Sequence, residues 1–101
     1  MSAIAADYRW LVIVWRLPSG VSTPRVTAWR RLKRIGAVPL TPGSAVVAYS
    51  EELQEQMDWI AEEITDADGD AWVLPVGQLP ERDEARIRRS MRRAATASRG
   101  A

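Results

Sequence analysis

The pattern of apolar and polar positions predicts a first strand that is buried on both faces. Every position from Trp10 to Trp15 is apolar, and the run is too short for a buried helix. A continuous apolar run of this length is typical of a central strand covered on both sides. The strand, expected over residues 8–16, ends at Arg16-Leu17-Pro18, where Pro18 and Gly20 interrupt it.

A basic amphipathic helix is predicted next. Ser22 or Thr23 can cap it, and Pro24 suits its first turn, where a missing N–H costs nothing. Gly36 supplies its end. The apolar face comprises Val26, Trp29 and Leu32, extended by Ala28 and Ile35.

Residues 37–40 and 44–49 are predicted to form a β-hairpin. They flank Thr41-Pro42-Gly43, a turn signature in which proline sets φ and glycine permits positive φ. Pro39 cannot donate to a strand ladder, so the first strand of the hairpin is expected to be an edge strand or to carry a bulge.

The second helix has the most regular apolar period in the chain. Ser50 caps it, and its apolar positions advance by four, three, four and three residues: Leu53, Met57, Ile60, Ile64 and Ala67. Asp68-Gly69-Asp70 ends it, and residues 71–76 are predicted to form the last strand.

The third helix begins at Leu79-Pro80-Glu81, with acids first and arginines later, an order that complements the helix dipole. Glu84 with Arg88 and Asp83 with Arg86 have the spacings of helical ion pairs. The apolar stripe is thin: Ile87, Met91, Ala94 and Ala95. A thin stripe predicts weak docking, or a segment that waits for a partner.

This order of elements predicts an α+β fold. The expected architecture is a ferredoxin-like βαββαβ sandwich, with a four-stranded antiparallel sheet, two helices on one face and an added C-terminal helix. We expect a disordered N-terminus over 1–7, the ferredoxin-like domain over 8–78, and a C-terminal basic helix and tail over 79–101. Trp10 and Trp15 are expected on the sheet face away from the neighbours of Val12 or at a dimer contact. A tryptophan on the open face needs a second subunit or the tail to cover it.

Composition removes several kinds of chemistry. The 101 residues suit one domain and contain no histidine and no cysteine, which excludes disulfides, thiolate nucleophiles, Ser-His triads and the common zinc sites. No apolar run approaches the ~20 residues that span a bilayer, and no signal peptide is visible. We therefore expect a cytoplasmic protein without a membrane segment, a metal or a cofactor.

The net charge of +1 hides three charged segments. Residues 25–34 carry five bases and no acid, residues 51–70 carry nine acids and no base, and residues 81–99 carry seven arginines and three acids. Near-neutral composition therefore says nothing about local surface potential.

The basic residues of the first helix, with one at the end of the first strand, are the candidate nucleic-acid or oxyanion ligands: Arg16, Arg25, Arg30, Arg31, Lys33 and Arg34. Arginine forks bind phosphate bidentately, and such a face gives salt-sensitive affinity. The alternative is a solvated face that pairs with the neighbouring acidic helix. The arginine-rich tail has the same two interpretations.

Two other features have a purely structural interpretation as well as a functional one. Asp66, Asp68 and Asp70 resemble a calcium loop but lack the bidentate glutamate that closes one, so an ordinary helix end is expected. Trp29 is expected in the core. Trp59 lies off the apolar stripe of its helix and is expected to be exposed.

Several stretches carry a resemblance to a known family. WLVIVWRLP, TPRVTAWRRLKRIGAVPL, MDWIAEEI and GDAWVLPV are similar to the N-terminal domain of the chromate resistance regulator ChrB, over roughly residues 10–90. In that family a second domain linked to chromate responsiveness usually follows, and we expect this chain to be a stand-alone N-terminal module. The layout also resembles the ferredoxin-like domains of CRISPR integration factors and phenylacetate-type repressors, which dimerise through their sheets.

The resemblance implies a homodimeric, DNA-associated transcriptional regulator linked to chromate resistance. Nucleases among the relatives use an aspartate at the end of the first strand, where this chain has Arg16 or Leu17. We therefore expect no enzymatic activity. The alternatives are a module that docks a separately encoded protein and a metal-dependent nuclease built on Asp7.

Overall fold

The computed structural model describes residues 7–18 and 23–100 and contains four strands and three helices. In chain order they are β1 Trp10–Arg16, α1 Thr23–Arg34, β2 Val38–Thr41, β3 Ser44–Ala48, α2 Glu51–Asp66, β4 Asp70–Val76 and α3 Glu81–Gly100. The predicted α+β class is confirmed. The predicted disordered N-terminus, except Asp7, and the alternative cap Ser22 lie outside the described residues.

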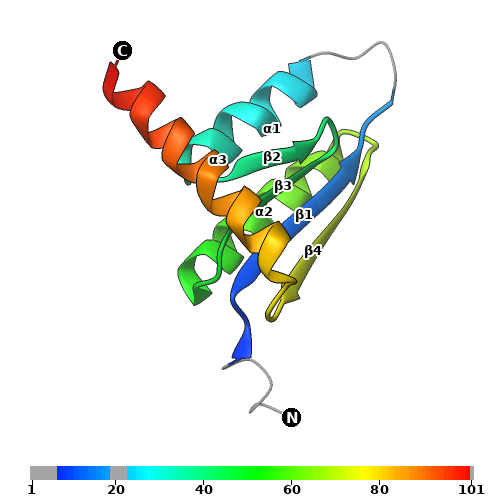
Figure 1. Cartoon of the computed structure of the whole chain (residues 1–101). Helices are drawn as coiled ribbons and strands as arrows, with labels where there is room; N and C mark the ends of the chain where they lie inside the picture. The colour runs from blue at the N-terminus through cyan, green and yellow to red at the C-terminus, as the bar shows by residue number, and fades with distance from the viewer. Residues whose placement is uncertain (1–6, 19–22, 101) are drawn as a thin grey trace.

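The strands form one antiparallel sheet in the order β2-β3-β1-β4 (Figure 1). β1 is central, as its unbroken apolar run predicted. Val12 lies opposite Val46 of β3 and opposite Leu74 of β4. The hairpin prediction is also confirmed, because β2 and β3 pair antiparallel. As expected from Pro39, β2 is an edge strand, and its register shifts between Pro39 and Thr41.

Helices α1 and α2 cover one face of the sheet, where the main core lies (Figure 1). Alternate residues of β1 point into it: Leu11, Ile13 and Trp15. They meet Leu32 of α1 and Met57 of α2, both fully buried. Burying each such side chain stabilises the fold by about 1.5–3 kcal/mol.

Local capping fixes where these two helices begin and end. The side chain of Ser50 accepts a hydrogen bond from the Leu53 N–H at 3.0 Å, which is the predicted cap of α2. Gly36 ends α1 with φ +85°, a backbone conformation that glycine adopts without strain. Asp68 takes the equivalent place after α2, with φ 66°.

Helix α3 covers part of the opposite face of the sheet (Figure 1). Ile87 is buried there with Trp10, Val38 and Val46, and Met91 packs against the same cluster. The structure therefore contains two apolar clusters, one on each side of the sheet.

The expected placement of Trp10 and Trp15 on the same face was wrong. The two residues are five positions apart, an odd number, so the alternation of a strand puts them on opposite faces. Trp10 shares the α3 face with Val12, whereas Trp15 lies in the main core. There it packs edge-to-face on the partly buried Trp29, with ring centroids 5.0 Å apart.

None of the helices in the described part of the chain is long and apolar enough to cross a bilayer. The longest, α3, has 20 residues and carries arginine along most of its length.

Candidate anion-binding surface

The outer face of α1 presents free cationic groups to solvent. Ala28 and Leu32 are buried, so helical geometry turns Arg30 and Arg34 outward, with Lys33 beside them. These three residues and Arg25 are exposed, and none has an ion-pair partner among the residues that the structure describes. Four of the six predicted ligands are thus available to an anion.

Arg31, unlike these residues, has an ion-pair partner. Its Nε lies 2.9 Å from a carboxylate oxygen of Glu63 on α2, which packs beside α1. The predicted neutralisation of α1 by the acidic helix is therefore observed at this one residue. Both side chains are about half exposed, so the pair contributes little to stability.

Arg16 does not lie beside Arg30 and Arg34 in the fold. Arg16 is the last residue of β1, and the chain continues from there into the first turn of α1. Arg30 and Arg34 lie in the second half of that helix. The guanidinium of Arg16 contacts Asp70 at 2.6 Å, directly opposite in the β1–β4 register. The six predicted residues are therefore not brought together into one site.

Helix α3 carries a longer basic stripe within the arginine-rich segment that the sequence offered as DNA-binding or merely solvated. Arg82, Arg86, Arg89 and Arg93 are exposed and recur at spacings of four, three and four residues. They lie opposite the side of the helix that buries Ile87. The spacing of these arginines in the sequence is the signal that marks the stripe.

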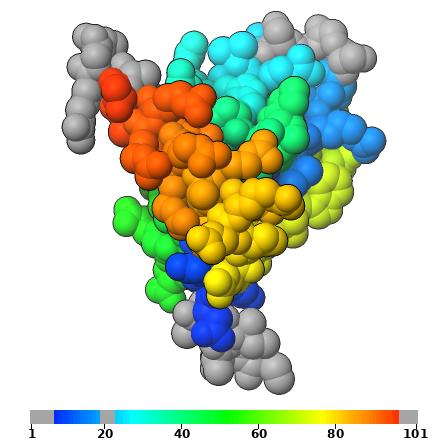
Figure 2. All heavy atoms as spheres, viewed as in Figure 1, coloured from blue at the N-terminus to red at the C-terminus, as the bar shows by residue number. Residues whose placement is uncertain are grey.

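The far half of α3 adds a shallow depression to this stripe. Arg89, Arg92, Arg93 and Thr96 line it. Figure 2 shows α3 as the most prominent element on this face of the molecule. The arginines of this half are exposed to solvent.

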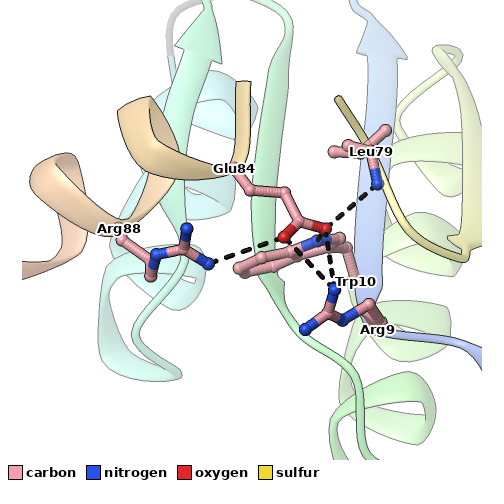
Figure 3. Close-up of polar contacts among 5 residues, drawn as sticks. All are labelled: Arg9, Trp10, Leu79, Glu84 and Arg88. Atoms are coloured by element: carbon pink, nitrogen blue, oxygen red, sulfur yellow. Dashed lines mark hydrogen bonds and ion pairs between the residues drawn. The ribbon is translucent and has the colours of Figure 1, made fainter. Parts of the chain in front are cut away.

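A buried carboxylate fixes the start of α3 on the sheet (Figure 3). Glu84 accepts hydrogen bonds from the Trp10 indole at 3.1 Å and from the Leu79 N–H at 3.0 Å. Arg9 lies 3.3 Å from it and Arg88 3.5 Å. The side chain of Glu84 is only 6% exposed, and in the described residues no buried side-chain polar atom is left unpaired.

These contacts lower the pKa of Glu84. The indole hydrogen bond is the main cause, followed by the Leu79 N–H; burial opposes them, and the charges of Arg9 and Arg88 add to the lowering. Glu84 therefore stays ionised at neutral pH. Its negative charge is turned inward, toward Arg9 and Arg88, and does not offset the outer arginines of α3.

The acidic residues of α2 lie on the other side of the sheet. All of them are exposed: Glu51, Glu52, Glu55, Asp58, Glu62, Glu63 and Asp66. Because α2 packs on β1 and β4 and α3 packs on β2, the sheet separates the acidic helix from the arginine stripe. The negative charge of α2 consequently lowers the positive electrostatic potential at the surface of α1 more than at the surface of α3.

The predicted helix end at residues 66–70 is observed. Asp68 occupies the turn after α2, and Asp70 contacts Arg16. In the described residues, no three acidic side chains lie close enough together to hold a metal ion.

Large apolar side chains are exposed beside α3 on its own face of the sheet. Trp72 and Leu74 are 53% and 44% exposed and lie opposite Val14 and Val12 of β1. Leu40 of the edge strand is also exposed. On the other side of the molecule, Trp59 is 70% exposed, as its position off the α2 stripe predicted.

Comparison with known proteins gives two matches. A family model described as "Protein ChrB, N-terminal" matches residues 25–99, from the first turn of α1 into the end of α3. Protein ChrB of Cupriavidus metallidurans strain CH34 is 32% identical over 79 residues, which are 78% of this chain. The chain spans 24% of the length of that relative.

Proposed function

This chain belongs to the family of ChrB N-terminal domains, as its resemblance predicted, and from this premise we propose that it is a DNA-associated module of transcriptional control linked to chromate resistance. Its role in this proposal is to bind the DNA backbone in the cytoplasm, without enzymatic activity of its own.

One observation carries the proposal: the cationic groups of α1 that face solvent without an ion-pair partner in the described residues. Arg30, Lys33 and Arg34 are exposed together on the second half of the helix. Guanidinium forks bind phosphate bidentately, and several of them along one face give affinity that falls with salt. The same groups also suit an oxyanion such as chromate, which arginine can attract as a dianion.

The fold assignment within this proposal is the ferredoxin-like sandwich. The order of strands and helices, with β1 and β3 in the middle of the sheet, supports it. A homodimer is also part of the proposal. The exposed Trp72 and Leu74 support it, because a second copy can cover an apolar patch that a monomer leaves in water.

A gel-shift titration of the protein against duplex DNA from its own promoter region, repeated over a range of salt concentrations, tests the DNA role. We expect a complex at low salt that weakens as salt rises, and weaker binding by the Arg30→Ala/Arg34→Ala variant. The absence of a complex at low salt would contradict the proposal.

A second candidate function is supported by Trp59. This side chain is exposed on α2, and its neighbours one helical turn away are Glu55, Glu62 and Glu63. An aromatic ring within an acidic face suits a cationic segment of another protein, since tryptophan is enriched at binding hot spots. Recovery of a stable protein partner by the wild type but not by Trp59→Ala, in the absence of nucleic acid, would favour this function.

A further inference from the structure

We propose that the outer arginine stripe of α3 is the main contact to duplex DNA, and that α1 is secondary to it. The inference rests on the proposed function and specifies the surface that performs it. The stripe consists of Arg82, Arg86, Arg89 and Arg93, with Arg92 beside them.

The two basic surfaces differ in the charge of what lies beside them. Residues 85–96 contain five arginines and no acid. Arg82 contacts Asp83 at 3.9 Å in the acidic first turn, and Arg88 is paired with the buried Glu84. The remaining arginines have no ion-pair partner among the described residues: Arg86, Arg89, Arg92 and Arg93. On α1, in contrast, Arg31 is paired with Glu63 and the acidic helix lies alongside.

The geometry of the stripe fits a phosphate backbone. From Arg82 to Arg93 the helix advances about 16 Å, and duplex DNA carries about ten phosphate charges over the same length of its axis. The stripe is held on a fixed helix, because Ile87 is buried on the sheet and Glu84 is hydrogen-bonded to Trp10 and Leu79. Because the helix is already ordered on the sheet, DNA binding has to order only the arginine side chains and not the backbone.

Two other polyanionic partners fit less well. Single-stranded nucleic acid stacks successive bases on several aromatic side chains, whereas α3 contains none and Trp72 is a single exposed ring beside it. An anionic membrane needs a free apolar helix face to insert, whereas Ile87 and Met91 of α3 are occupied by the sheet. Duplex DNA needs only the charged face that α3 exposes.

The β2 edge of the sheet brings α1 into the same region. Strand β2 begins at Val38, four residues after Arg34. Val38 packs in one cluster with Ile87 and Met91 of α3. The end of α1 and the middle of α3 thus lie at the same edge of the sheet, on opposite faces. DNA placed along α3 can reach the exposed basic side chains of α1 at this edge.

Two triple variants that each remove three positive charges test the inference. The α3 variant is Arg86→Gln/Arg89→Gln/Arg93→Gln, and the matched α1 variant is Arg30→Gln/Lys33→Gln/Arg34→Gln. All six side chains are exposed and outside the Glu84 network, so circular dichroism should show wild-type helix content for both. Binding to a short duplex of mixed sequence is measured by fluorescence anisotropy between about 50 and 200 mM salt.

We expect the α3 variant to lose at least about tenfold in affinity and to reduce the slope of log K against log salt by up to about 2.7, the value for three phosphate contacts. The α1 variant should lose less affinity, and its slope of log K against log salt should change less. Replacing the three α3 arginines by lysine should keep the slope while lowering affinity, because charge is retained and the bidentate fork is lost.

The outcomes separate the two proposals. If the wild type binds and the α3 variant keeps the wild-type slope, or if the α1 variant loses as much as the α3 variant, the α3 inference is wrong and the DNA role stands. If the wild type shows no salt-dependent binding to duplex DNA, both are wrong. Stronger binding to vesicles of phosphatidylserine and phosphatidylcholine than to the duplex would also overturn the α3 inference.

Discussion

At the scale of single residues, Glu84 connects three parts of the chain through one buried carboxylate. It accepts hydrogen bonds from Trp10 and from the backbone of Leu79, with Arg9 and Arg88 beside it. Its pKa is lowered from an ordinary value of 4.5. The charged form is therefore favoured in the folded state, and this stabilisation is complete above pH 4.5 and is lost as pH falls through the lowered pKa.

The Glu84→Gln variant should unfold at a lower temperature than the wild type at pH 7, because the amide keeps the shape but loses the charge that Arg9 and Arg88 compensate. The difference in Tm should shrink as pH falls from 4.5 through the lowered pKa, because Glu84 of the unfolded chain is protonated first and the folded carboxylate is neutralised only below its lowered pKa. Thermal melts followed by circular dichroism at several pH values measure this. Glu81→Gln in the exposed first turn is the control, and a Tm difference that does not change with pH would contradict the account.

Gly69 gives a second prediction at this scale. A β-carbon there would lie 2.5 Å from the Arg16 carbonyl oxygen and 2.9 Å from side-chain carbons of Ile64 and Leu17. Gly69→Ala should therefore reduce the free energy of unfolding by about 1–3 kcal/mol, the usual cost of overpacking. Gly36→Ala is the matched control, because that position has open space but φ +85° and should lose about 1–2 kcal/mol through backbone strain. Urea unfolding measures both, and an unchanged midpoint for Gly69→Ala would show that the close approach is absent.

At the scale of elements, the docking of α3 depends on few apolar side chains. Ile87 is buried in the second cluster, whereas Ala95 on the same helix is exposed. Ile87→Ala should reduce the free energy of unfolding by about 2–5 kcal/mol and increase amide hydrogen exchange along α3. Ala95→Ser should change it by less than about 0.5 kcal/mol. If Ile87→Ala leaves exchange in α3 unchanged, the helix is held by other contacts.

Elements with strong local signals were predictable from the sequence. The turn at Pro42-Gly43, the break at Pro39, the Ser50 cap and the stripe of α2 each depend on residues close together in the chain, and all are observed. The contact of Glu84 with Trp10 joins positions 74 apart, which no local spacing reveals. The fixed placement of α3 depends on this contact and was therefore missed. Of the two predicted ion pairs, Glu84–Arg88 is confirmed, whereas Asp83 contacts Arg82 and not Arg86.

The candidate site was predictable only in part, for a related reason. The exposure of Arg30 and Arg34 follows from helical periodicity and is observed. The pairing of Arg16 with Asp70 depends on strand register, which the sequence did not specify. The relative importance of α1 and α3 depends on which side of the sheet the acidic helix occupies, a property of the tertiary structure alone.

At the scale of the whole molecule, opposite charges are separated in space. The acidic helix α2 packs on β1 and β4, while α3 packs on the opposite edge strand, β2, and on the other face. A net charge of +1 therefore coexists with a basic region at the β2 edge, formed by α3 and the end of α1, and an acidic surface on α2. Such separation orients a charged partner before contact and makes association sensitive to salt.

The exposed apolar patch on the sheet gives a prediction about assembly. Trp72 and Leu74 are exposed on the face that α3 only partly covers. If a second copy covers this patch, light scattering should give the mass of a dimer for the wild type and of a monomer for Trp72→Glu/Leu74→Glu. The matched control is Trp59→Glu on α2, which should stay dimeric. A monomeric wild type at high concentration would contradict the proposed homodimer.

The most direct test of the central claim, that DNA binds on the basic side formed by α3 and the end of α1, is an NMR titration of the ¹⁵N-labelled protein with duplex DNA. The account predicts the largest shifts for the backbone and guanidinium signals of residues 86–93, smaller shifts for residues 30–34, and none for the acidic helix over residues 51–66. Shifts concentrated in the acidic helix around Trp59, or an unchanged spectrum at low salt, would contradict it.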